Sequence, residues 1–252
     1  MKKIIAVIAL TFLVLSSCSK DSTENESIGI VKANNKKTLG TSAHDLLSED
    51  KFDSILIELV YVEGFEPSTA AINNLVSFLN NRLHKSGGIS VEKRAIPSPG
   101  NESYTNAQII AIEDANRIHY NEDGQIAVWA FFADAKSSTD TNTAVVLGTA
   151  YRNTSFVIFE NTVQKLSNSP FKPNRTVLET TVINHEFGHI LGLTNVGTPL
   201  QSDHEDAAHK RHCNVTSCLM YWESESGNNV LGGVIPQLDA QCIADLRANG
   251  GK

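Results

Sequence analysis

Residues 176–192 read TVLETTVINHEFGHILG, and the rest of the chain is interpreted around this stretch. Thr176 and Glu179 stand three residues apart, as in a capping box that starts a helix. Gly192 suits the left-handed turn that ends one. Apolar side chains recur between them at helical spacing: Val177, Leu178, Val182, Ile183, Phe187, Ile190 and Leu191. The sequence therefore predicts an amphipathic helix over residues 176–192.

This helix contains a His-Glu-x-x-His motif at residues 185–189. His185 and His189 are four residues apart, so both imidazoles project from one face of the helix and can bind one metal ion. Glu186 follows the first histidine and is placed to act on a water molecule as general base rather than as a ligand. In zinc hydrolases, histidines bind the metal and a carboxylate takes the proton from the attacking water. We predict a Zn²⁺ cofactor, His185 and His189 as metal ligands, and Glu186 as the catalytic residue.

The composition describes a globular protein. The chain has 252 residues, of which 41% are hydrophobic and 19% charged, which is enough for one domain with a sizeable core and unlike a disordered or fibrous chain. Its formal net charge of −7 argues against nucleic acid as a partner.

The first residues have the features of an export signal. Lys2 and Lys3 precede an apolar run at residues 4–15 that is too short to span a bilayer stably. The sequence LSSC at residues 15–18 resembles the lipobox of bacterial lipoproteins, which implies cleavage before Cys18 and a lipid on that cysteine. Cleavage would remove two of 21 basic residues and none of 28 acidic ones, which makes the net charge −9. We expect an exported lipoprotein at the outer membrane, cell surface or periplasm; an ordinary secretory signal is the alternative.

The predicted domain organisation has three parts. Residues 1–17 are the lipoprotein signal peptide. Residues 18–50 are rich in polar side chains and poor in aromatic ones, which is typical of a flexible tether, with a pro-segment as the alternative. Residues 51–252 form the folded domain.

Strands and helices alternate before the motif helix. Apolar runs predict strands at residues 54–61, 89–96, 125–133, 144–151 and 156–159, helices at 67–83 and 106–119, and a final helix at 236–249. This order is typical of an α/β (α+β) fold in which a sheet and helices pack as layers.

Three features together resemble the metzincin metallopeptidases. They are the zinc helix ending at Gly192, the Cys-Leu-Met-Tyr turn at residues 218–221, and the strand-helix-strand order before them. The resemblance implies a metzincin-like zincin fold with a twisted mixed sheet, an active-site helix, a methionine turn and a C-terminal helix. It implies an endopeptidase in which zinc-activated water hydrolyses a peptide bond with Glu186 as general base. Met220 would pack beneath the metal, and an extended protein or peptide substrate would pair with an edge strand at residues 145–151.

The third metal ligand departs from the usual metzincin pattern. Three residues after Gly192 stands Asn195, whose neutral amide oxygen is a poor zinc ligand. The run at residues 212–220, His-Cys-x4-Cys-x-Met, is similar to that of archaemetzincins, where the third histidine directly precedes the first cysteine. The similarity implies His212 as third ligand, with His204, Asn195 and His209 as alternatives.

Three cysteines follow Cys18, namely Cys213, Cys218 and Cys242. Export permits a disulfide, and Cys213 and Cys218 would close a short loop. A structural metal bound by all three is the competing interpretation. Archaemetzincins hold a second zinc with four cysteines, so a chain with three matching ones is not expected to hold that metal.

Two functions from other classes remain open. A surface binding module that kept the zincin fold but lost catalysis is compatible with Asn195. A zinc hydrolase outside the metzincins could use Glu205 or Glu223 as its third ligand. The sequence leaves the substrate, the cleavage preference and the oligomeric state undetermined.

Overall fold

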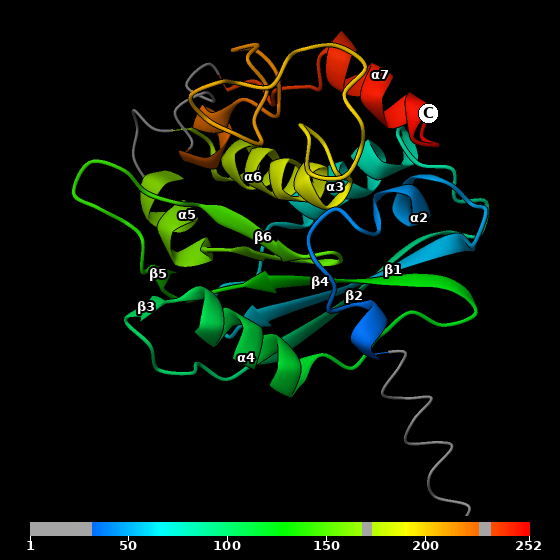
Figure 1. Cartoon of the computed structure of the whole chain (residues 1–252). Coiled ribbons are helices and arrows are strands. Elements are labelled where there is room, and N and C mark those ends of the chain that lie inside the picture. The colour runs from blue at the N-terminus through cyan, green and yellow to red at the C-terminus, as the bar shows by residue number, and fades with distance from the viewer. Residues whose placement is uncertain (1–31, 168–172, 227–232) are drawn as a thin grey trace, which may run out of the picture.

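The computed structural model describes residues 32–167, 173–226 and 233–252 (Figure 1). The predicted signal peptide, the lipobox cysteine and the first half of the predicted tether lie outside these residues. None of the described helices is long and apolar enough to cross a bilayer.

A five-stranded sheet forms the centre of the fold, in the order β2-β1-β4-β7-β6. β1, β2, β4 and β7 run parallel to one another, whereas β6 pairs antiparallel with β7 and forms one edge. A short parallel pair, β3 with β5, forms separately. The strand bounds are Phe52–Val62 (β1), Gly88–Ile96 (β2), Ser103–Tyr104 (β3), Gly124–Phe132 (β4), Lys136–Ser137 (β5), Gly148–Arg152 (β6) and Ser155–Ile158 (β7).

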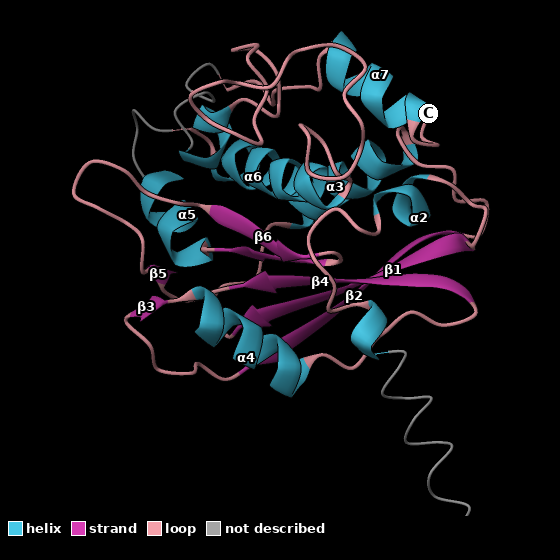
Figure 2. Ribbon diagram, viewed as in Figure 1, coloured by secondary structure: helices cyan, strands magenta, loops and turns pink. Residues whose placement is uncertain are grey.

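Helices cover both faces of the sheet (Figure 2). Alternate residues of a strand point to opposite faces. In β4, Val128 and Ala130 therefore join one core, while Trp129 and Phe131 join the other. The first core lies between the sheet and the helices α3 and α6. The second lies between the sheet and α4, on the opposite face (Figure 1). The helix bounds are Ala43–Leu47 (α2), Thr69–Asn80 (α3), Asn106–Asn116 (α4), Glu160–Ser167 (α5), Arg175–Ile190 (α6) and Ala240–Ala248 (α7), with a 3₁₀ turn at Trp222–Ser226 (η1). The predicted layered α/β fold with a mixed sheet is confirmed.

The tether prediction is wrong for residues 32–50, which pack against the domain. Leu46 and Leu47 are fully buried in the main core. Lys85 Nζ donates hydrogen bonds to the backbone carbonyls of Asp45, Ser48 and Phe52, which ties the segment to the loop before β2. The polar composition was misleading because the domain itself supplies partners for these polar groups.

The structure also corrects several predicted ends. The N-cap of α6 is Asn174, whose side chain accepts from Thr176 N–H, so the capping box of Thr176 and Glu179 is not formed. Glu179 is buried and accepts a hydrogen bond from Arg175 Nε instead. α7 begins at residue 240 after the N-cap Asp239, later than predicted, and residues 144–147 do not join β6.

Candidate metal centre and substrate cleft

The two histidines of α6 face one another. Their Nε2 atoms are 3.1 Å apart, and both side chains are buried. His185 Nδ1 lies 2.7 Å from the carbonyl oxygen of Leu219, which can only accept, so this nitrogen carries the proton. In the neutral ring Nε2 then has the lone pair, and it faces His189 Nε2, as in a metal ligand whose other ring nitrogen donates to the backbone.

The loop after α6 brings His212 to the same place. The ligand atoms of His185, His189 and His212 all lie within 4.8 Å of one another. His212 Nδ1 lies 3.1 Å from the carbonyl oxygen of Lys210, so its Nε2 is also an acceptor. Two nitrogens bound to one tetrahedral zinc at about 2.0–2.1 Å would lie about 3.3 Å apart, close to the value in α6. The donor set and its spacing therefore fit a zinc ion.

Glu186 is fully buried between α6 and the edge strand. A Cβ built on Gly148 of β6 would lie 2.6 Å from Glu186 Cγ, so only glycine permits this close approach. Glu186, His189 and His212 together line a cavity of about 290 Å³ that also includes Gly148 and Thr149. The carboxylate thus lies beside the histidines and an open sheet edge. Such an arrangement can accept a proton from water next to an extended chain.

The turn at residues 218–221 supports α6 from the other side. A Cβ on Gly188 would collide with Met220 Sδ, so the buried methionine packs directly against the helix between the two histidines. The neighbouring Leu219 carbonyl holds the His185 ring. Met220 is thus a packing residue at this site.

The other candidate ligands lie elsewhere. Asn195 has a positive φ of 67° and lines a second cavity. The His209 ring stacks on Trp222 with centroids 4.3 Å apart. Neither Glu205 nor Glu223 joins a group of metal-binding donors within the described residues.

His204 belongs to a second cluster, under α7. Its Nε2 lies 2.7 Å from Asp245 Oδ2, and because a carboxylate accepts, Nδ1 is left facing the thiols. His204 Nδ1 lies 3.5 Å from Cys213 Sγ and 4.0 Å from Cys242 Sγ. The Cys218 and Cys242 sulfurs are 3.6 Å apart, and all three cysteines are buried and free. The possible disulfide between Cys213 and Cys218 is therefore not formed.

Backbone N–H groups surround the sulfur of Cys218. Met220 N and Asp239 N donate to Cys218 Sγ at 3.4 Å and 3.5 Å. Hydrogen bonds from the Cys213 and Cys242 thiols, followed by these backbone bonds, lower the pKa of Cys218 to about 4. The ligand atoms of His204, Cys213, Asp239 and Cys242 all lie within 4.8 Å of one another. Imidazole, thiolate and carboxylate are the ligands that zinc takes in proteins, so this cluster also fits zinc.

Solved structures with a similar fold include zinc peptidases. Archaemetzincin from Methanopyrus kandleri matches with a TM-score of 0.50 and 17% identity over 78% of this chain and 96% of its own. The fold is archaemetzincin-like. A zinc-dependent peptidase from Methanocorpusculum labreanum follows with a TM-score of 0.46 and 14% identity over 75% of this chain and 99% of its own. Metalloproteinase-II from Bacteroides fragilis has a TM-score of 0.41 and 12% identity, over 81% of this chain and 54% of its own.

At 17% identity the likeness to archaemetzincin is one of fold, and it confirms the predicted metzincin-like architecture. No protein-family model matches the sequence, and no curated protein matches it either. The function therefore has to be argued from the residues of the site.

Proposed function

We propose that the protein is a zinc-dependent peptidase that hydrolyses protein or peptide substrates. The observation that carries the proposal is the convergence of His185, His189 and His212 beside a buried glutamate, in a cavity at the open edge of the sheet. Three imidazoles with one position left for water are the donor set of catalytic zinc sites.

Each residue of the proposed site has one task. His185, His189 and His212 would hold zinc, which when bound supplies Lewis-acid activation of water and of the substrate carbonyl. Glu186 takes the proton from the attacking water and passes it to the leaving amine. An extended substrate pairs with the backbone of β6, which is the edge strand of the sheet on the side of Glu186. Glu186 then lies beside the bond that is broken, because it contacts Gly148 of that strand.

Replacement of Glu186 tests this assignment. Glu186→Gln removes the base but keeps its shape, so we expect peptide cleavage to fall by at least about 100-fold, within the range for a positioned general base, while bound zinc is unchanged. Glu122→Gln serves as the control, because Glu122 is exposed in the turn before β4 and lies outside the cavity, so the variant should cleave like the parent. Parent-like cleavage by Glu186→Gln would reject the mechanism, and absence of zinc from the parent would favour a binding module.

We also propose a second, structural zinc held by His204, Cys213, Asp239 and Cys242. Sites with four protein ligands leave no position for substrate and stabilise the fold instead. Chelation should therefore lower the Tm of the parent, and His204→Ala should lower it before chelation and reduce the further effect. A His204→Ala protein with the parent's Tm and zinc content would contradict this second site.

The sequence before the described residues supports a proposal on location. We propose an exported lipoprotein, anchored through a lipid on Cys18 after removal of residues 1–17. Cys18→Ala should move the protein from the membrane fraction to the soluble one. A distribution unchanged by that substitution would exclude the anchor.

A further inference from the structure

A second and larger cavity adjoins the one at the three histidines. It has a volume of about 680 Å³ and extends along β6 to Tyr151 and Arg152. Both cavities are lined by Leu39, Asn106, Thr149, Ala150 and Arg211. They are consecutive parts of one cleft that leads from Glu186 along the edge strand.

The larger cavity is basic, although the whole chain has a net charge of −7. Its charged lining residues are Lys36, Lys37, Arg152 and Arg211, and no acidic side chain from the described residues lines it. Lys36 Nζ and Arg152 Nη1 each lie 2.7 Å from Asp114 Oδ1, behind the cavity wall. Arg152 and then Lys36 lower the pKa of that carboxyl by hydrogen bonding to it, so it stays ionised. Arg152 also pairs with Glu113, so both of these cations have acidic partners.

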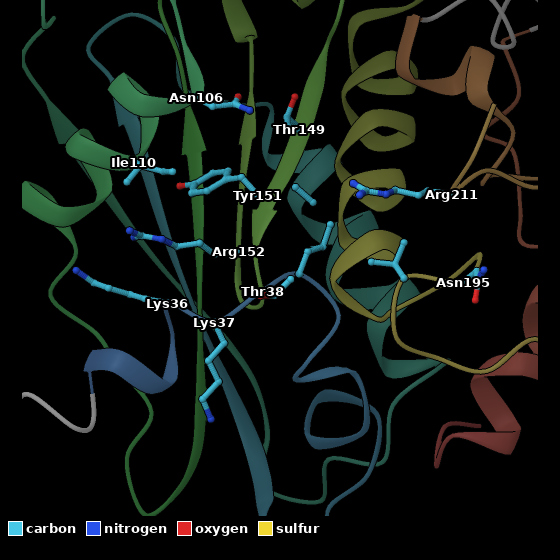
Figure 3. A pocket seen from close by; sticks show the side chains of 13 residues that line it. Lys36, Lys37, Thr38, Asn106, Ile110, Thr149, Tyr151, Arg152, Asn195 and Arg211 are labelled. Atoms are coloured by element: carbon cyan, nitrogen blue, oxygen red, sulfur yellow. The ribbon is translucent and has the colours of Figure 1, made fainter. Parts of the chain in front are cut away.

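Lys37 and Arg211 carry the uncompensated charge. Within the described part of the chain neither side chain forms an ion pair, in contrast to Lys36 and Arg152. Figure 3 shows Arg211 extending from the loop beside α6 toward Tyr151 and Thr149, whereas Arg152 and Lys36 lie on the opposite side of the cavity. Of the basic residues, Arg211 alone lines both parts of the cleft.

The backbone of Arg211 is held in a conformation that side chains other than glycine rarely adopt. Its φ is 69°, in the left-handed region. Its N–H donates to Glu205 Oε1 at 3.0 Å, and its carbonyl accepts a hydrogen bond from Thr194 Oγ1. Such backbone strain persists only where neighbouring groups fix it, and it concentrates at functional sites. The strain here fixes the position of a guanidinium one residue before His212.

We propose that Arg211 binds a carboxylate of the peptide substrate, with Lys37 adding to the positive potential. This inference rests on the proposed peptidase function, and it assigns to the cleft a preference for peptides with an acidic group. A guanidinium binds a carboxylate through paired, charge-assisted hydrogen bonds. The acidic group would lie in the part of the cleft that leads from Glu186 along β6. The carboxylate comes either from an Asp or Glu side chain or from the end of the peptide.

Binding to the full-length Glu186→Gln protein tests the proposal without turnover. Four fluorescent peptides of one sequence are compared, with either Glu or Gln in the middle and either a free or an amidated C-terminus. We expect one carboxylate to tighten binding by roughly tenfold, as one charge-assisted hydrogen bond would. In Arg211→Gln this difference should disappear. Lys210→Gln is the matched control, because this exposed neighbour has the same charge but lines neither cavity.

Each outcome has a defined meaning. A preference for internal Glu identifies an acidic side chain as the ligand, and a preference for the free end identifies the terminal carboxylate; both support the proposal if Arg211→Gln alone removes them. Equal binding of all four peptides, absence of binding, or a preference that survives in Arg211→Gln overturns it.

Cleavage of the same peptides by the parent separates this inference from the proposed function. If the parent cleaves them in a Glu186-dependent manner with no preference for acidic groups, the carboxylate site is wrong and the peptidase stands. If acidic peptides bind through Arg211 but no Glu186-dependent cleavage occurs, the peptidase is wrong and the carboxylate site stands.

Discussion

Glycine at two positions makes the proposed zinc site possible. Gly188 admits Met220 against α6 between the two histidines, and Gly148 admits Glu186 against β6. Both contacts leave no space for a Cβ. A residue other than glycine at position 188 or 148 would therefore push α6 away from the methionine turn or from the edge strand. The distances between the histidines and the glutamate depend on this close packing.

Gly188→Ala tests the contact with the methionine. Alanine favours a helix over glycine by about 1 kcal/mol, but overpacking at Met220 should cost about 1–3 kcal/mol, so we expect a net loss of stability. In a Met220→Ala background the collision is absent, and the same substitution should be neutral or stabilising. Urea unfolding of the four proteins measures the coupling. Equal effects of Gly188→Ala in both backgrounds would show that the two residues are not in contact.

The histidines differ in how far they could be predicted. The spacing of His185 and His189 follows from helix geometry alone, because any helix places residues four apart on one face. The choice of His212 came from resemblance to archaemetzincins, and the structure places it near the other two. A metal bound by the three cysteines was the competing interpretation, but the contact of His204 with them was not predicted, since it depends on the path of an irregular loop. His204, one of three histidines shortly before Cys213, together with the three cysteines, was the available signal.

The N-terminal segment joins the domain through one short helix. α2 inserts Leu46 and Leu47 into the main core, and Gly40 lies against Val196 and Gly197 in the loop that follows α6. This segment therefore supports the same loop that delivers Arg211 and His212. Because the segment is rich in polar residues, its sequence did not indicate that Leu46 and Leu47 are buried.

Leu46→Ala should destabilise the domain by about 2–5 kcal/mol, as expected for truncation of a fully buried leucine. Thermal or urea unfolding measures the change. Lys51→Ala is the control in the same region, because its side chain is 63% exposed and should have little effect. A tether would tolerate both substitutions equally, so an unchanged stability in Leu46→Ala would contradict the observed packing.

The elements of the core were predictable because their sequence patterns are dictated by burial. β1 and β4 are buried on both faces, so their continuous apolar runs identified them and their neighbours in a layered sheet. The ends were less predictable. A side chain such as Asn174 or Glu179 can form a cap or a buried ion pair, and tertiary contacts decide which one forms.

The molecule as a whole consists of a regular α/β half and an irregular half built around two groups of metal-binding side chains. The sheet with α3, α4 and α6 carries the cores and one wall of the cleft. The described residues between α6 and α7 form only the short turn η1, yet they supply His204, His212 and Arg211. Bound zinc at both clusters would supply the stability that this half lacks in secondary structure. With zinc bound at both clusters, the fold and the site would be coupled through metal.

The zinc content of the purified full-length protein and of two matched variants tests the three-histidine centre most directly. His212→Ala removes the proposed third ligand, while His209→Ala removes a histidine of the same loop that stacks on Trp222 instead. The account predicts about two zinc ions per chain in the parent and in His209→Ala, and one fewer in His212→Ala. A His212→Ala protein that retains all the zinc of the parent would contradict the account.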